Sequence, residues 1–104
     1  MDVLKRTLLE GRTGVVVWGA GPTGKAFSRS LAEASVPVCA FVDLDPRKIG
    51  QEIHGAPVVR PEGVEAYREA LSVAAVGNDV AREEIRVELE SRGWREMVDF
   101  CAVA

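Results

Sequence analysis

Residues 15–24 read VVVWGAGPTG, and this segment is the main indication of the fold of this chain. Three consecutive valines followed by a tryptophan are typical of a strand that is buried on both faces, as in a parallel sheet. The glycines that follow have the G-x-G-x-x-G spacing of a tight turn between a strand and a helix. We therefore predict a strand at residues 14–18, a glycine turn, and a helix at residues 23–34.

Each glycine of this turn has a mechanical role that can serve a bound phosphate group. Gly19 can adopt the backbone angles of the turn, Gly21 has no Cβ to keep a phosphate away, and Gly24 lets the helix lie close to the strand. The free N–H groups at the start of the helix, where a proline fits well, favour an anion. The same glycines can also serve a tight turn that has no ligand. The candidate nucleotide-binding residues of the turn are Gly19, Ala20, Gly21, Pro22, Thr23 and Gly24.

Asp43 stands at the end of the next expected strand, residues 36–42, at a suitable distance past the glycines. An acidic side chain at this place can accept hydrogen bonds from the ribose hydroxyls of an adenosine. It can equally cap the turn that follows, and the sequence leaves both roles open. Arg47 and Lys48 come next; they can meet a 2′-phosphate, but we favour a solvent-exposed turn for both.

The rest of the chain alternates between strand and helix patterns. Residues 49–57 have two glycines and no helical period, so we expect a loop there, and Pro57 favours an edge position for the strand that follows. The pattern predicts an α/β, three-layer half-Rossmann fold whose five-stranded parallel sheet has the order 3-2-1-4-5. Strands are expected at residues 14–18, 36–42, 56–59, 71–76 and 97–103, and helices at residues 2–10, 23–34, 61–70 and 80–92.

Asn78 follows the fourth expected strand, so it should lie beside the glycine turn across the switch point of the sheet. Its side chain can cap the next helix, or it can contact a ligand. Capping alone accounts for an asparagine here, but its position makes Asn78 a further candidate cofactor-binding residue.

Composition and charge limit the classes of protein. The 104 residues suffice for one domain, with residues 1–13 as an N-terminal helix or linker. The net charge of −3 and the absence of a basic stripe lead us to expect no nucleic-acid partner. No apolar run approaches the ~20 residues that span a bilayer, and Met1 does not begin a signal peptide, so we expect a cytoplasmic protein without a membrane span.

We predict no catalytic and no metal-ligating residue. His54 is the single histidine and stands in the expected loop, and Tyr67, the single tyrosine, belongs to no Tyr-x-x-x-Lys pair. Cys39 and Cys101 fall in strands three places apart, roughly 14 Å at about 4.8 Å per strand, which exceeds the reach of a disulfide. Both are expected to be free thiols.

Three motifs resemble segments of known families: VVVWGAGPTGKAF, AFVDLDPRKIGQEIHGAPVV and AAVGNDVAREEIRVELESRG. Together they resemble the N-terminal domain of bacterial sugar O-acyltransferases. The DPRKIG and HGAPVV segments and the ending DFCAVA are still more similar to the C-terminal domain of certain bacterial family 2 glycosyltransferases. The resemblance implies a Rossmann-like domain that binds a nucleotide-sugar, NAD(P) or CoA. By that resemblance the contact residues are Gly19, Gly21, Gly24, Asp43 and Asn78.

These observations favour a non-catalytic module that binds a small-molecule nucleotide, either NAD(P) or a nucleotide-sugar, in glycosyl transfer or sugar modification. The alternatives are an interaction or dimerisation domain with an emptied Rossmann site, and a small NAD(P)-dependent oxidoreductase component. Retention of all three glycines favours the binding module. The expected strand at residues 97–103 leaves an unpaired apolar edge, so we also expect a homodimer or association with a glycosyltransferase catalytic domain.

Overall fold

The glycine turn joins strand β1 (Val15–Trp18) to helix α1 (Pro22–Glu33), as the sequence predicts. The structure, a computed structural model, describes residues 9–103, so nearly all of the helix expected at residues 2–10 lies outside the described residues. All four residues of β1 are fully buried. This burial on both faces explains why the strand has valines in sequence rather than an alternation of apolar and polar residues.

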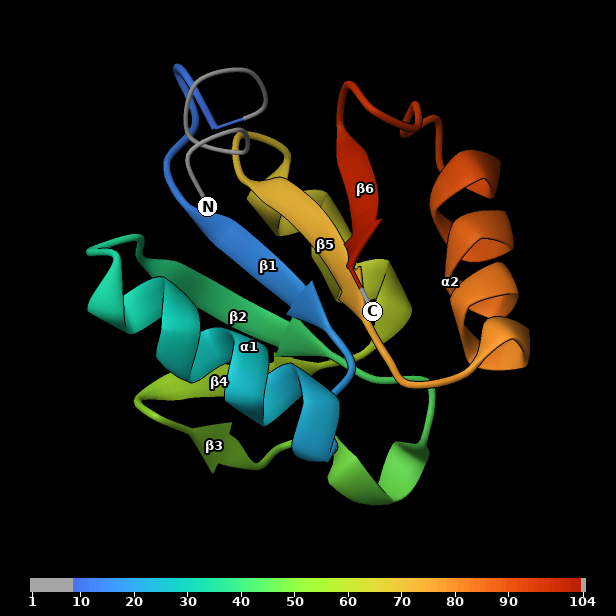
Figure 1. The fold of residues 1–104 in the computed structure, drawn as a ribbon. Helices are drawn as coiled ribbons and strands as arrows, with labels where there is room; N and C mark the ends of the chain where they lie inside the picture. Colours follow the sequence, from blue (N-terminus) through green and yellow to red (C-terminus); the bar gives the residue numbers. More distant parts are fainter. Residues whose placement is uncertain (1–8, 104) are drawn as a thin grey trace.

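Five parallel strands form the body of the sheet, and their order confirms the predicted arrangement 3-2-1-4-5. Strand β1 lies at the centre, so the carboxyl ends of β1 and of its two neighbours meet at one edge of the sheet (Figure 1). The other parallel strands are β2 (Val38–Val42) and β4 (Ala56–Val59) on one side of β1, and β5 (Leu71–Ala75) and β6 (Phe100–Val103) on the other.

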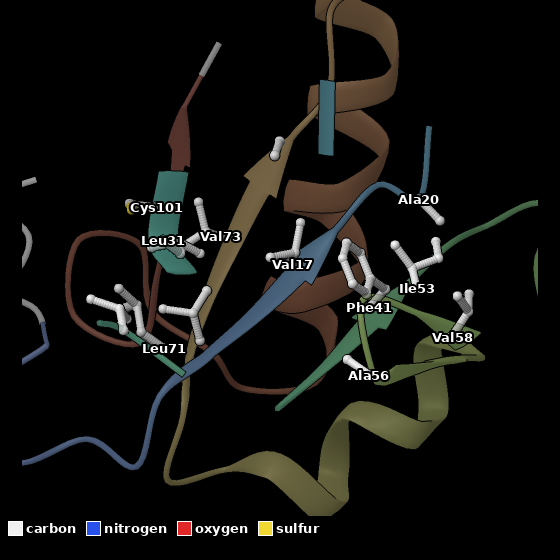
Figure 2. Close-up of a cluster of buried hydrophobic side chains, with 13 residues drawn as sticks. Val17, Ala20, Leu31, Phe41, Ile53, Ala56, Val58, Leu71, Val73 and Cys101 are labelled. Atoms are coloured by element: carbon white, nitrogen blue, oxygen red, sulfur yellow. The ribbon is translucent and has the colours of Figure 1, made fainter. Parts of the chain in front are cut away.

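Helical segments cover both faces of the sheet and give the three predicted layers (Figure 1). Leu31 of α1 joins a buried cluster on one face, together with Val17, Phe41 and Val73 of the sheet (Figure 2). The other face is covered by α2 (Asp79–Ser91) and by η3 (Pro61–Tyr67), a 3-10 helix where the sequence predicts a longer helix. There Trp18 is fully buried, and its indole N–H donates to Ser72 Oγ at 3.2 Å.

A sixth strand, β3 (Glu52–Ile53), lies where the sequence predicts only a loop. It pairs antiparallel with β4, so β4 is not at the edge of the sheet, and the prediction of five strands is wrong by this one. His54 and Gly55 form the two-residue connection with φ values of 51° and 84°. Positive φ at both central residues is the geometry that a tight hairpin requires, and the pair His-Gly is the signal that could have revealed it.

The strand predicted at residues 97–103 is shorter than expected, because β6 begins at Phe100. Met97 has a positive φ of 62°, and the Asp99 carboxylate accepts a hydrogen bond from the Arg95 N–H at 2.9 Å, which closes a loop before the strand. Met97 and Val98 are exposed in this loop, whereas Phe100 and Cys101 are buried. Strand β6 still lies at the edge of the sheet, so the expected edge is present but shorter than predicted, and the homodimer stays a prediction.

The sheet order keeps the two cysteines apart, and one polar pair joins the β3–β4 hairpin to α1. Cys39 and Cys101 lie on β2 and β6 and are free, as predicted. Burial raises the pKa of the Cys101 thiol to about 11, with a further contribution from the charge of Glu96. On the α1 face, buried Ser28 shares a hydrogen bond of 3.1 Å with exposed His54, which ties the β3–β4 hairpin to α1.

Candidate nucleotide-binding site

The glycine turn is held tightly at two of its glycines and is open at the third. Gly19 has a φ of 122°, and a Cβ added there would lie 2.6 Å from the carbonyl oxygen of Ala75. A Cβ at Gly24 would overlap the carbonyl oxygen of Gly19, so α1 can approach β1 only with glycine at this position. At Gly21 a Cβ would have a single neighbour within 4 Å, the Lys48 ammonium at 3.9 Å. The open side of Gly21 is therefore where a ligand can approach the backbone.

A cavity of about 370 Å³ lies along α1, away from the glycine turn. The predicted site residues instead line a second cavity, at the glycine turn. This second cavity has a volume of about 210 Å³ and lies at the carboxyl ends of β1 and β5. It brings together seven of the eight predicted site residues, all except Ala20. They are Gly19, Gly21, Pro22, Thr23, Gly24, Asp43 and Asn78.

The start of α1 faces this cavity with unpaired donors. Gly21 is the N-cap and supplies no side-chain hydrogen bond, and the first turn contains no acidic residue. Pro22 has no N–H, so the next N–H groups, from Thr23 and Gly24, are left without a partner in the helix. Together with the helix dipole they favour a negatively charged group above the turn.

Asp43 takes the turn-capping role that the sequence left open, and its geometry leaves room for the ligand role. Its Oδ1 accepts a hydrogen bond from the Asp45 N–H, and its Oδ2 accepts one from the Ala20 N–H, both at 2.8 Å. The second bond fastens the glycine turn to the end of β2 and explains why Ala20 does not face the cavity. Since a carboxylate offers about four lone-pair sites, two remain for hydroxyl groups of a ligand.

A pocket of about 200 Å³ continues the cavity past Asp43. The two hollows share Gly19, Asp43, Val76 and Ala81, and the pocket is walled on its far side by Leu44 and Ile85. Its lining is mostly apolar, which suits a flat aromatic ring such as a nucleobase.

Asn78 takes the capping role that the sequence favoured. Its Oδ1 accepts a hydrogen bond from the Ala81 N–H at 2.8 Å and so begins α2. The side-chain amide group of Asn78 is not used in this bond, and the residue lines the cavity opposite the glycine turn. Capping and ligand contact are therefore compatible at this position.

Arg47 and Lys48, which the sequence places together in an exposed turn, face different ways. Arg47 is bound to the Asp45 carboxylate at 2.9 and 3.0 Å and its side chain is 88% exposed. This hydrogen bond from the Arg47 side chain holds the pKa of Asp45 below its usual value. Lys48 instead lies over the glycine turn, a placement that the sequence analysis missed because nothing in its pattern separates the two residues.

In the part of the chain that the structure describes, no group of three or more potential ligands could hold a metal ion. Within the same residues, no helix has both the length and the apolar composition that crossing a membrane requires.

The strand order and the glycine turn define a domain with a Rossmann-like fold. Residues 11–97 match the model of a family described as C2185-like, N-terminal, and the chain belongs to this family. It is also 36% identical over 73 residues to the redox-sensing transcriptional repressor Rex of Treponema denticola, an alignment that covers 64% of this chain and 35% of Rex.

Solved structures share the fold. RSP, a Rex-family repressor, superposes with a TM-score of 0.68 at 20% identity, over 98% of this chain and 57% of RSP. Perosamine N-acetyltransferase from Caulobacter crescentus, solved with CoA and GDP-perosamine, gives a TM-score of 0.63 at 24% identity, over 81% of this chain and 41% of that one. The chain thus spans about a third of its curated relative and little more than half of RSP. The Rossmann-like part of the predicted resemblance is confirmed, whereas these comparisons give no support to the link with glycosyltransferases.

The prediction that excludes nucleic acid as a partner is wrong. RSP has been solved in complex with β-NAD+ and operator DNA, and the curated relative is a transcriptional repressor. The exclusion rested on the net charge of −3 and the missing basic stripe. The charge of one domain does not report on surfaces elsewhere in a longer polypeptide, and this chain covers only 54% of the DNA-bound RSP chain.

Proposed function

We propose that this chain is a binding module for an adenine dinucleotide, with NAD(H) as its ligand. The observation that carries the proposal is the continuous hollow at the carboxyl ends of the central strands, with an open glycine turn at one end and an apolar pocket at the other. Two relatives support it: RSP has been solved with β-NADH and with β-NAD+, and the curated relative is a redox-sensing repressor.

Each part of the hollow suits one part of this ligand. The pyrophosphate would lie over Gly21, where the N–H groups of the first turn of α1 can donate to it. The hydroxyl groups of the adenosine ribose would donate hydrogen bonds to the free lone pairs of Asp43. The adenine ring would occupy the 200 Å³ pocket between Leu44 and Val76.

The charges near Asp43 favour NAD(H) over NADP(H). A 2′-phosphate would lie against the carboxylate of Asp43, which repels it. Of the two adjacent cations that could compensate, Arg47 is already held by Asp45, and Lys48 lies over the glycine turn. The ribose end of the site is therefore suited to a free 2′-hydroxyl.

We also propose that the module senses the nucleotide rather than transforms it. Among the described residues, Asp43 is the one carboxylate that lines the 210 Å³ cavity, and both of its oxygens already accept hydrogen bonds from backbone N–H groups. Such a carboxylate is placed to hold a ligand rather than to move a proton.

Isothermal titration calorimetry of the 104-residue chain tests the proposal, with NADH, NAD+, NADP+, UDP-glucose and GDP-mannose as ligands. We expect NADH or NAD+ to bind and to stabilise the fold by about 2.7 kcal/mol at a hundredfold excess over Kd. The two sugar nucleotides serve as controls, because they lack the adenosine that Asp43 and the apolar pocket would hold. Tighter binding of a sugar nucleotide than of NADH, or no binding of any dinucleotide, would contradict the proposal.

An Asp43→Asn variant should weaken NAD+ binding by about 1–3 kcal/mol, which is roughly 5- to 150-fold in Kd. The amide keeps one acceptor oxygen but turns an NH2 group toward one of the two backbone N–H donors, so some stability is lost as well. Comparing ADP with 2′-deoxy-ADP separates the two effects. The parent should prefer ADP, and the variant should lose that preference.

Asp79→Asn removes the same charge at an exposed place outside both hollows and serves as the matched control. An unchanged preference for ADP in Asp43→Asn would restrict Asp43 to its structural role in the turn.

A further inference from the structure

Among the described residues that line the 210 Å³ cavity, Lys48 is the one cation. It is the last residue of η2 (Pro46–Lys48), a 3-10 helix directly after β2. Its ammonium lies 3.9 Å from the position that a Cβ on Gly21 would take. Lys48 thus stands over the open face of the turn, beside the N-cap of α1.

The local structure that brings Lys48 to this place is fixed by hydrogen bonds. Asp45 caps η2 by accepting from the Arg47 N–H at 3.0 Å, and the Lys48 N–H donates to the Asp45 carbonyl oxygen at 3.0 Å. Asp45 is in turn held by Asp43, which accepts from its N–H at 2.8 Å. One hydrogen-bonded unit therefore positions both the carboxylate at the ribose end and the ammonium at the phosphate end.

The charge of Lys48 is available to a ligand. Among the described residues, no carboxylate lies within 4.0 Å of its ammonium, whereas its neighbour Arg47 is held by Asp45. Lys48 is half-buried, so its charge is less screened by solvent than that of the exposed arginine. An ammonium group with three donors can follow a phosphate oxygen over a range of positions.

We propose that Lys48 is the residue that recognises the phosphates of the bound nucleotide, from its place over the open face of the glycine turn. This inference rests on the proposed function and deepens it. The positive charge offsets the repulsion between Asp43 and a pyrophosphate, so the site takes an adenine nucleotide that carries a diphosphate in preference to the bare nucleoside. Hydroxyl recognition at Asp43 and phosphate recognition at Lys48 are linked through η2.

The test compares Lys48→Gln with Arg47→Gln, which removes the same charge from the adjacent position of the same 3-10 helix. Binding of NADH, ADP and adenosine to the full chain is followed by NMR chemical-shift titration. We expect Lys48→Gln to weaken NADH and ADP about 10-fold, the loss of one charge-assisted contact, and to leave adenosine within about twofold of the parent. Arg47→Gln should change none of the three by more than about twofold, and Lys48→Arg, which keeps the charge, should retain most of the affinity for ADP.

The outcomes separate this inference from the proposed function. If the parent chain binds neither NADH nor ADP, the proposed function fails. If the parent binds them and Lys48→Gln binds them equally well, the role of Lys48 is refuted while the proposed function stands. The role of Lys48 would also be refuted if Lys48→Gln lost as much affinity for adenosine as for ADP, or if Arg47→Gln lost affinity to the same extent. Either result would indicate that the substitution disturbs the structure of η2.

Discussion

A Gly24→Ala variant is expected to lose about 3 kcal/mol or more of its unfolding free energy, the upper end of the usual cost of overpacking. The added methyl group would overlap the carbonyl oxygen of Gly19 and lie 2.8 Å from its carbonyl carbon. Both neighbours are backbone atoms, so no rotation of a side chain can relieve the clash. Gly19 cannot retreat either, because its N–H donates to the Val42 carbonyl oxygen at 2.8 Å and the Ala75 carbonyl lies on its other side.

Urea unfolding without ligand measures this loss, and Gly21→Ala is the matched control in the same turn. The alanine at position 24 gains up to about 1 kcal/mol in helix propensity, which is too little to offset the clash. Gly21→Ala should unfold within about 1 kcal/mol of the parent, because its Cβ would meet only the Lys48 ammonium. Equal stability of the two variants would show that α1 can move off β1 without cost.

The second large effect is expected from Gly21→Val, which should weaken NADH binding at least about 100-fold, or 2.7 kcal/mol. Gly21 has φ −90° and ψ −165°, an extended conformation that valine adopts readily. The fold should therefore persist, apart from a cost of about 1 kcal/mol for valine at an N-cap. The two methyl groups would fill the space over the turn that a phosphate needs.

Calorimetry with NADH and urea unfolding of the same samples distinguish a blocked site from a damaged fold. Gly21→Ala should fall between the parent and Gly21→Val in affinity, since one methyl group fills less of the space. If Gly21→Val binds NADH as the parent does, the phosphates do not lie over this turn and the site is elsewhere.

The parts of the fold that follow from a single local rule could be predicted from the sequence. A run of valines buried on both faces identifies β1, and the glycine spacing identifies the turn, so the order of the parallel strands followed from the alternation of elements. Strand β3 could not be found in this way, because two residues are too few to show a period of two. The sequence feature that indicates β3 is the His54–Gly55 turn that follows it, not the strand itself.

The sequence predicts the parts of the candidate site whose positions the backbone fixes. It does not predict which long side chains extend into the cavity. The glycines and Asp43 stand at positions that the strand–turn–helix unit fixes. Lys48 and Arg47 are adjacent and have equal charge, so only the geometry of η2 and the carboxylate of Asp45 decide which of them faces the cavity. No pattern in the sequence contains that information.

The burial of Cys101 makes this thiol a reporter of motion in the edge strand. Because burial raises the pKa of the Cys101 thiol to about 11, the reactive thiolate is scarce at pH 7 while β6 is in place. Alkylation by iodoacetamide must then wait for β6 to detach from β5, much as amide hydrogen exchange waits for a local opening. The labelling rate of Cys101 thus measures how often the outermost strand opens, and oxidants can reach the sulfur only through the same rare event.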